Sequence, residues 1–147
     1  MLRISLFLIA ITAVFGFRTE FENKQDALDF LNNSNIWVAG MPEFKLDEEN
    51  AVLNILLKSE QGTVVANVPL KDIKTVLVTG KLVTVELNCK GGEFCATANT
   101  SNTVAETDGL TLVMSSTFDD GTYRDQYVEQ GAKVADAIDY LISFYTE

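Results

Sequence analysis

The feature that most constrains the fold is a succession of short apolar stretches, each closed by a turn signal. Phe44 and Leu46 alternate with charged residues before a DEEN turn, and residues 51–58 end at an SEQG turn. The pattern repeats over further stretches: residues 63–68, 75–79, 81–89, 93–100 and 110–116. Alternation over short stretches bounded by turn residues is typical of β-strands. We therefore expect about seven strands, mainly antiparallel.

Helical spacing occurs near both ends of this region. Residues 22–33 place Ala27, Leu28 and Leu31 on one face, which predicts a short N-terminal helix. The next apolar residues, 36–38, predict a short strand, and the PLKDI segment of residues 69–73 predicts a short helical turn because proline cannot donate to a sheet.

The last part of the chain predicts an amphipathic helix over residues 129–145. Its apolar stripe consists of Val134, Ile138, Leu141, Ile142 and Tyr145. Its opposite face carries Asp136, Asp139 and Ser143. We therefore expect an α+β fold, an antiparallel sandwich or barrel that a C-terminal helix caps and a short N-terminal helix precedes.

The N-terminus has the pattern of a secretory signal. Arg3 precedes an apolar run over residues 4–15, which is short for a membrane span. A cut after Gly16 predicts a signal peptide at 1–16 and one domain at 17–147, in a secreted or periplasmic protein. A cut after Ala13 and an uncleaved N-terminal anchor are the alternatives.

Charge and composition exclude several classes of function. The formal net charge of −10 argues against binding to nucleic acid and against strong binding to anionic membranes. Histidine is absent, which removes the commonest general base and zinc ligand. We therefore expect no enzyme, no cofactor and no metal.

The acidic clusters do not change this expectation. Asp47, Glu48 and Glu49 share a turn, as do Asp119 and Asp120, and neither cluster has the spacing of a calcium loop. A carboxylate-dependent hydrolase would need the fold to gather Asp119, Asp120 and Asp125 with another acid; it remains a minor alternative.

The only cysteines, Cys89 and Cys95, stand in the sequence CKGGEFC. A hairpin centred on Gly92 would place Lys90 opposite Phe94 and Cys89 opposite Cys95, within disulfide reach. An exported protein favours a disulfide over free thiols, and zinc would need further Cys or His ligands.

The loop that this disulfide would close is our candidate for contact with a partner. It comprises Lys90, Gly91, Gly92, Glu93 and Phe94. Two glycosylation sequons, at Asn32 and Asn99, matter only in a eukaryotic source.

The strands followed by one helix resemble the pleckstrin-homology-like superfold. PLKDI, CKGGEFC and the final KVADAIDYLISFY are similar to small exported proteins of unknown function from Bacteroidetes, over roughly residues 25–146. The first hairpin turn, KSEQG, offers Lys58 beside Glu60 and lacks the basic cluster of phosphoinositide-binding domains.

These observations together predict an exported, non-enzymatic binding or interaction module for an unknown protein or small molecule. The alternative is a lipocalin-like carrier of an apolar ligand. Against the carrier, Trp37 follows Asn35 and Ile36 without the GxW pattern of lipocalins.

Overall fold

The computed structural model describes residues 21–37, 40–115 and 121–146. It contains two α-helices, α2 (Lys24–Leu31) and α3 (Arg124–Ser143), and two short 3₁₀ helices, η1 (Ser34–Ile36) and η2 (Lys90–Gly92). The strands are β1 (Glu43–Asp47), β2 (Val52–Ser59), β3 (Gly62–Pro69), β4 (Ile73–Thr79), β5 (Val83–Cys89), β6 (Ala96–Asn99), β7 (Val104–Thr107) and β8 (Gly109–Val113). The predicted α+β class, with antiparallel strands, a C-terminal helix and a short helix before the strands, is confirmed.

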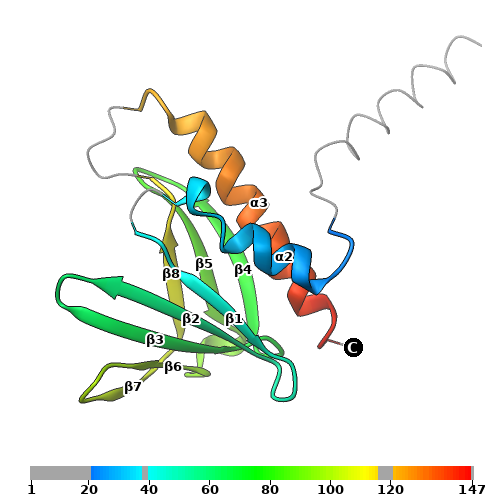
Figure 1. Ribbon diagram of the computed structural model, residues 1–147, viewed down its shortest axis with the longest axis vertical. Coiled ribbons are helices and arrows are strands. Elements are labelled where there is room, and N and C mark those ends of the chain that lie inside the picture. The colour runs from blue at the N-terminus through cyan, green and yellow to red at the C-terminus, as the bar shows by residue number, and fades with distance from the viewer. Residues whose placement is uncertain (1–20, 38–39, 116–120, 147) are drawn as a thin grey trace, which may run out of the picture.

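The strands form two antiparallel sheets. One sheet has the order β1-β2-β3-β6-β7, and the other has the order β4-β5-β8. The chain therefore passes from one sheet to the other after β3, after β5 and after β7, and the two sheets run in different directions beneath the helices (Figure 1). The larger sheet combines the consecutive strands β1, β2 and β3 with the later pair β6 and β7, and the smaller sheet combines the β4–β5 pair with the later strand β8.

Alternation along the strands determines which side chains form the core. In β2, Leu53 and Ile55 are fully buried, and their register partners in β3 are Val68 and Ala66. In β5, Val83, Val85 and Leu87 are buried, with intervening residues only partly so. One face of each sheet thus joins a single apolar cluster shared with both helices.

Helix α3 covers the buried face of the three-stranded sheet (Figure 1). Of the predicted stripe, Val134, Ile138 and Leu141 are fully buried, Ile142 is half-buried, and Tyr145 lies beyond the end of the helix. Gly131 permits close packing, because a Cβ atom there would lie 2.8 Å from Leu77 Cδ1. Asp139, on the exposed side, still accepts a hydrogen bond from the Thr75 hydroxyl of β4.

Helix α2 packs against α3 and β1. The Asn23 side chain caps its first turn by accepting from the Asp26 N–H at 3.0 Å, and Asn32 follows its last turn. Ala27 and Leu31 are fully buried, which confirms the predicted helical face.

The predicted strand over residues 36–38 is wrong for Ile36 and Trp37, and Val38 lies outside the described residues. Ile36 ends the 3₁₀ helix η1, whose first turn is capped by the Asn33 side chain accepting from the Asn35 N–H. The Trp37 indole N–H then donates to the Leu31 carbonyl oxygen at 2.7 Å. These polar contacts hold the segment against the end of α2, so the apolar residues are buried without joining a sheet.

Two further segments differ from expectation. The PLKDI segment forms a tight turn rather than a helical one: Asp72 N–H donates to the Pro69 carbonyl, and Pro69 itself ends β3 opposite Val52. Strand β7 occupies part of what the sequence presents as a polar loop, and its residues from Val104 to Glu106 are exposed. An exposed edge strand carries no alternating pattern that would reveal it.

Within the described parts of the chain, none of the helices has the length and apolar character needed to cross a bilayer.

Candidate binding site at the disulfide loop

The structure joins Cys89 and Cys95 in a disulfide, with their Cα atoms 5.7 Å apart. Cys89 is the last residue of β5, and Cys95 directly precedes β6. The predicted pair is therefore present. Because β5 and β6 belong to different sheets, the bond lies at a crossing between the sheets.

The predicted hairpin around this pair is wrong. Strand β5 pairs with β4 and β8, whereas β6 pairs with β3 and β7. The Cys89 N–H donates to the Asp108 carbonyl at 2.7 Å, so Asp108 holds the position that Cys95 would have taken in a hairpin. Lys90 consequently does not pair with Phe94 across a ladder.

The glycine pair explains how the chain leaves the sheet. Gly91 has a φ of 78° and Gly92 a φ of 72°, in the left-handed region that glycine adopts without a steric penalty. These two successive left-handed residues, the last two of η2, turn the backbone out of the line of β5. The same glycines that suggested a hairpin therefore direct the chain to the other sheet.

Two hydrogen bonds attach the loop to the turn between β3 and β4. The Lys90 N–H donates to the Asp72 carbonyl at 2.7 Å, and the Lys90 ammonium donates to the Lys71 carbonyl at 3.0 Å. With the disulfide, these contacts fix the base of the loop. The loop residues Lys90 to Phe94 are all exposed, and the Phe94 side chain is 67% exposed.

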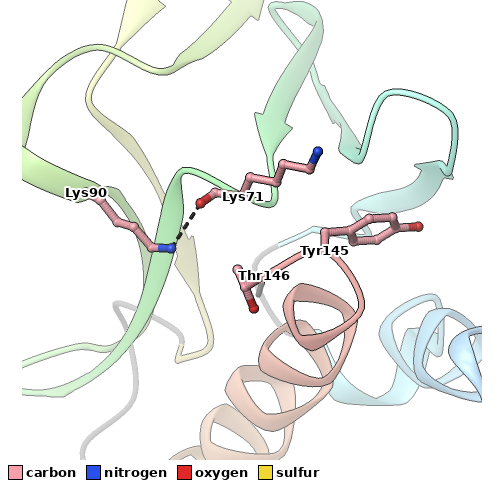
Figure 2. A pocket seen from close by; sticks show the side chains of 4 residues that line it. All are labelled: Lys71, Lys90, Tyr145 and Thr146. Atoms are coloured by element: carbon pink, nitrogen blue, oxygen red, sulfur yellow. Dashed lines mark hydrogen bonds between the residues drawn. The ribbon is translucent and has the colours of Figure 1, made fainter.

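An open depression lies where this loop meets the C-terminal end of α3. Lys71, Lys90, Tyr145 and Thr146 line it (Figure 2). The Lys71 ammonium has no hydrogen-bond or ion-pair partner among the described residues, and Lys90 uses one donor on the Lys71 carbonyl. Among the described residues, no acidic side chain lines the depression to compensate these two positive charges.

A third lysine stands close to Tyr145 but is already engaged. The Lys24 ammonium lies 5.6 Å from the centre of the Tyr145 ring and 3.1 Å from the Glu48 carboxylate. The hydrogen bond to Glu48 raises the pKa of Lys24, against the opposing effect of burial. Lys24 therefore helps to hold Tyr145 in place, while Glu48 neutralises its charge.

The acidic cluster at the first turn has a structural role. The Asp47 carboxylate accepts from the Asn50 side-chain amide at 2.8 Å and from its main-chain N–H at 3.1 Å. These hydrogen bonds lower the pKa of Asp47, so the carboxylate closes the turn as an ionised acceptor.

The other sequence candidates do not come together. Asp119 and Asp120 lie outside the described residues, and Asp125 is in the first turn of α3. The buried Ser115 hydroxyl accepts from the Val83 N–H. Within the described ranges, no group of three or more histidine, cysteine, aspartate or glutamate side chains could hold a metal ion.

The two sequons lie in different settings. Asn32 Nδ2, the atom that would carry a glycan, donates to the Phe44 carbonyl. Asn99 lies in β6, and its Oδ1 atom is buried without a hydrogen-bond partner among the described residues.

No protein-family model, curated protein or solved structure matches the chain.

The sequence identified the loop but missed the residues that meet it. Lys71 stands in the β3–β4 turn, and Tyr145 and Thr146 follow α3, so sequence distance hides their association with Lys90. One sequence feature points this way: Lys71 and Lys90 belong to residues 51–100, which carry five lysines against four acidic residues although the whole chain is strongly acidic.

Proposed function

We propose that the chain is an exported, non-enzymatic binding module that contacts its partner through the disulfide-closed loop of residues 90–94. One observation carries this proposal: the loop is fixed at its base while Phe94, a large apolar side chain, stays 67% exposed at its end. Aromatic side chains on rigid supports lose little conformational entropy on binding and contribute strongly to interfaces.

Export is part of the proposal and is supported by two independent features. Disulfides persist in oxidising compartments, and the N-terminal run over residues 4–15 has the pattern of a signal sequence. Mass spectrometry of the protein from its source tests this directly. A mature N-terminus at Phe17 with Cys89 and Cys95 oxidised is expected; a full-length chain with free thiols would contradict export.

The non-enzymatic part rests on chemistry that the sequence lacks. Without histidine, acid–base work would fall to carboxylates, lysines or tyrosines. The carboxylates of Asp47 and Asp139 are each engaged by a neighbouring side chain, Asn50 and Thr75.

The carrier of an apolar ligand has less support than the binding module. The space between the sheets and α3 is occupied by fully buried side chains, among them Leu53, Leu87, Met114 and Leu141. The depression next to the loop is lined by lysines and is open rather than apolar and enclosed.

Capture from the source's extracellular fraction tests the loop. Immobilised wild-type protein and the Phe94→Ala and Tyr123→Ala variants are compared; Tyr123 is a matched control, an aromatic residue 58% exposed at the start of α3. We expect one captured molecule that wild type and Y123A retain in equal amounts. F94A should retain at least about fivefold less of it. Equal retention by F94A and Y123A would contradict a partner surface at the loop.

A further inference from the structure

The depression beside the loop contains two ammonium groups with unused hydrogen-bond donors. Lys71 has none of its three donors engaged by a described residue, and Lys90 donates once, to the Lys71 carbonyl. No acidic side chain belongs to the lining among the described residues. In a chain with a net charge of −10, such a surface is a local exception.

Tyr145 bounds the depression on the side toward which the Lys71 side chain extends (Figure 2). Its buried hydroxyl group points away from Lys90 and Thr146, and the Lys24 ammonium lies 5.6 Å from the centre of its ring. The capacity of the depression to bind a ligand therefore comes from its two lysines.

The two ammonium groups lie apart (Figure 2). Figure 2 shows the Lys90 side chain reaching the Lys71 carbonyl, while the Lys71 side chain extends away from Lys90, on the side where the Tyr145 ring lies. A single small anion contacts one of these groups at a time. A ligand with two separated anionic groups can contact both.

We infer that this depression binds a small ligand with two anionic groups, carboxylates or phosphates, one received by Lys71 and the other by Lys90. The inference rests on the proposed function in one respect: the two anionic groups would belong to the partner that contacts the loop, at the place where the loop joins the fold. Because Cys89 directly precedes Lys90, the disulfide holds one of the two receiving groups in position.

Lysines near the C-terminal end of a helix also have a structural explanation. The carbonyl groups at that end carry partial negative charge, which Lys71 and Lys90 complement. A purely structural role predicts that neutralising either lysine changes stability and leaves no specific effect on anions. The experiment therefore measures both stability and binding.

The full folded protein is titrated with pyrophosphate and with citrate, and separately with inorganic phosphate and with acetate, at constant ionic strength. Amide chemical shifts of Lys71, Lys90 and Thr146 report the site. We expect saturable shifts at these residues with pyrophosphate, citrate or both, and binding at least about tenfold weaker for phosphate and acetate, which offer a single anionic group. Comparison of pyrophosphate with citrate distinguishes a phosphate ligand from a carboxylate ligand.

Matched variants locate the effect. Lys71→Gln and Lys90→Gln each remove one charge, and glutamine at position 90 can still donate to the Lys71 carbonyl; Lys81→Gln removes the same charge from the exposed β4–β5 turn. We expect K71Q and K90Q each to weaken binding about tenfold and K81Q less than about twofold, with all three variants folded.

Three outcomes would overturn the inference: no saturable shift with either two-group probe, equal weakening by K81Q, or single-group anions binding as tightly as the two-group probes. None of these affects the proposed function, which depends on Phe94 and is read from capture by F94A. If F94A loses capture and the wild-type protein binds no anion, only the anion site is contradicted. If F94A is captured like wild type and the wild-type protein binds the two-group probes, only the loop as a partner surface is contradicted.

Discussion

Asn32 and Phe44 exchange two hydrogen bonds. Asn32 Nδ2 donates to the Phe44 carbonyl at 3.0 Å, and the Phe44 N–H donates to Asn32 Oδ1 at 2.8 Å. A side-chain amide thus pairs with β1 as a neighbouring strand would. The end of α2 is thereby joined to the first strand, whose Phe44 ring is 2% exposed.

Replacing Asn32 by alanine should lower the free energy of unfolding by about 1–3 kcal/mol, because it leaves both main-chain groups of Phe44 without partners. Chemical denaturation measures the change. Asn35→Ala is the control, since Asn35 is exposed in η1 and its side chain makes no hydrogen bond to a described residue. An N32A variant as stable as N35A would show that the exchange contributes nothing.

Gly109 is expected to tolerate no side chain. A Cβ atom there would lie 2.5 Å from the Leu87 carbonyl oxygen, a main-chain atom that cannot move without disturbing the β5–β8 pairing. Gly109→Ala should therefore cost about 1–3 kcal/mol of stability. At Gly80 nothing lies within 4 Å of the corresponding position, so Gly80→Ala is the matched control. Thermal unfolding of the two variants decides the comparison, and equal melting temperatures would contradict it.

Loss of the disulfide should weaken the fold without abolishing it. The bond closes a short loop, for which the chain-entropy model gives about 2 kcal/mol. The Cys89→Ala/Cys95→Ala double variant should therefore unfold at lower denaturant concentration and keep the far-ultraviolet circular dichroism of wild type. Wild type with reductant should match the double variant. Unchanged stability, or complete unfolding, would contradict this.

Asp139 should make stability fall as pH rises. Burial of the carboxyl group raises its pKa, the hydrogen bond from Thr75 opposes this, and the nearby Asp136 charge adds to it. The folded state then binds the proton more tightly than the unfolded state does. Its stabilising effect is present at low pH and is lost between the ordinary pKa of aspartate and the raised value in the fold.

The Asp139→Asn variant removes this titration, while its side-chain oxygen can still accept from Thr75. We expect D139N to be more stable than wild type at about pH 7, with a smaller advantage at about pH 4. Because the residue as a whole is exposed and only its carboxyl group is partly desolvated, solvent screens the effect and the difference should be small. Urea denaturation at both pH values measures it, with Asp108→Asn as a charge-matched control in an exposed turn. A D139N variant that is less stable than wild type at neutral pH would contradict the expected sign.

The parts of the fold that sequence could predict are those that depend on near neighbours. The stripe of α3 and the β4–β5 turn at Gly80 follow from residues a few positions apart, and both are confirmed. The predicted strand at Ile36 is wrong because apolar content alone does not distinguish a strand from a buried 3₁₀ turn. The Asn33 cap and the Trp37–Leu31 hydrogen bond decide that choice.

The error at CKGGEFC has a different cause. Residue spacing was sufficient to predict the Cys89–Cys95 pair, since a disulfide depends on the local reach of the chain. The strand partner of β5 is a long-range property: β8 occupies the edge that β6 was expected to take. The meeting of Lys90 with Lys71 and Tyr145 depends on this same long-range arrangement. The likeness to the pleckstrin-homology-like superfold stays a prediction.

The alternation of the chain between its two sheets has a consequence for synthesis. Strands β3 and β5 are inner strands of the finished sheets, yet their second neighbours, β6 and β8, are translated only after β5 is complete. On the ribosome, both strands therefore present an edge of unpaired main-chain N–H and C=O groups until residues 96–113 have emerged. Such edges attract other extended chains. Slowing translation or removing a holding chaperone should therefore affect the yield of this protein more than that of a protein whose sheets each come from one continuous segment.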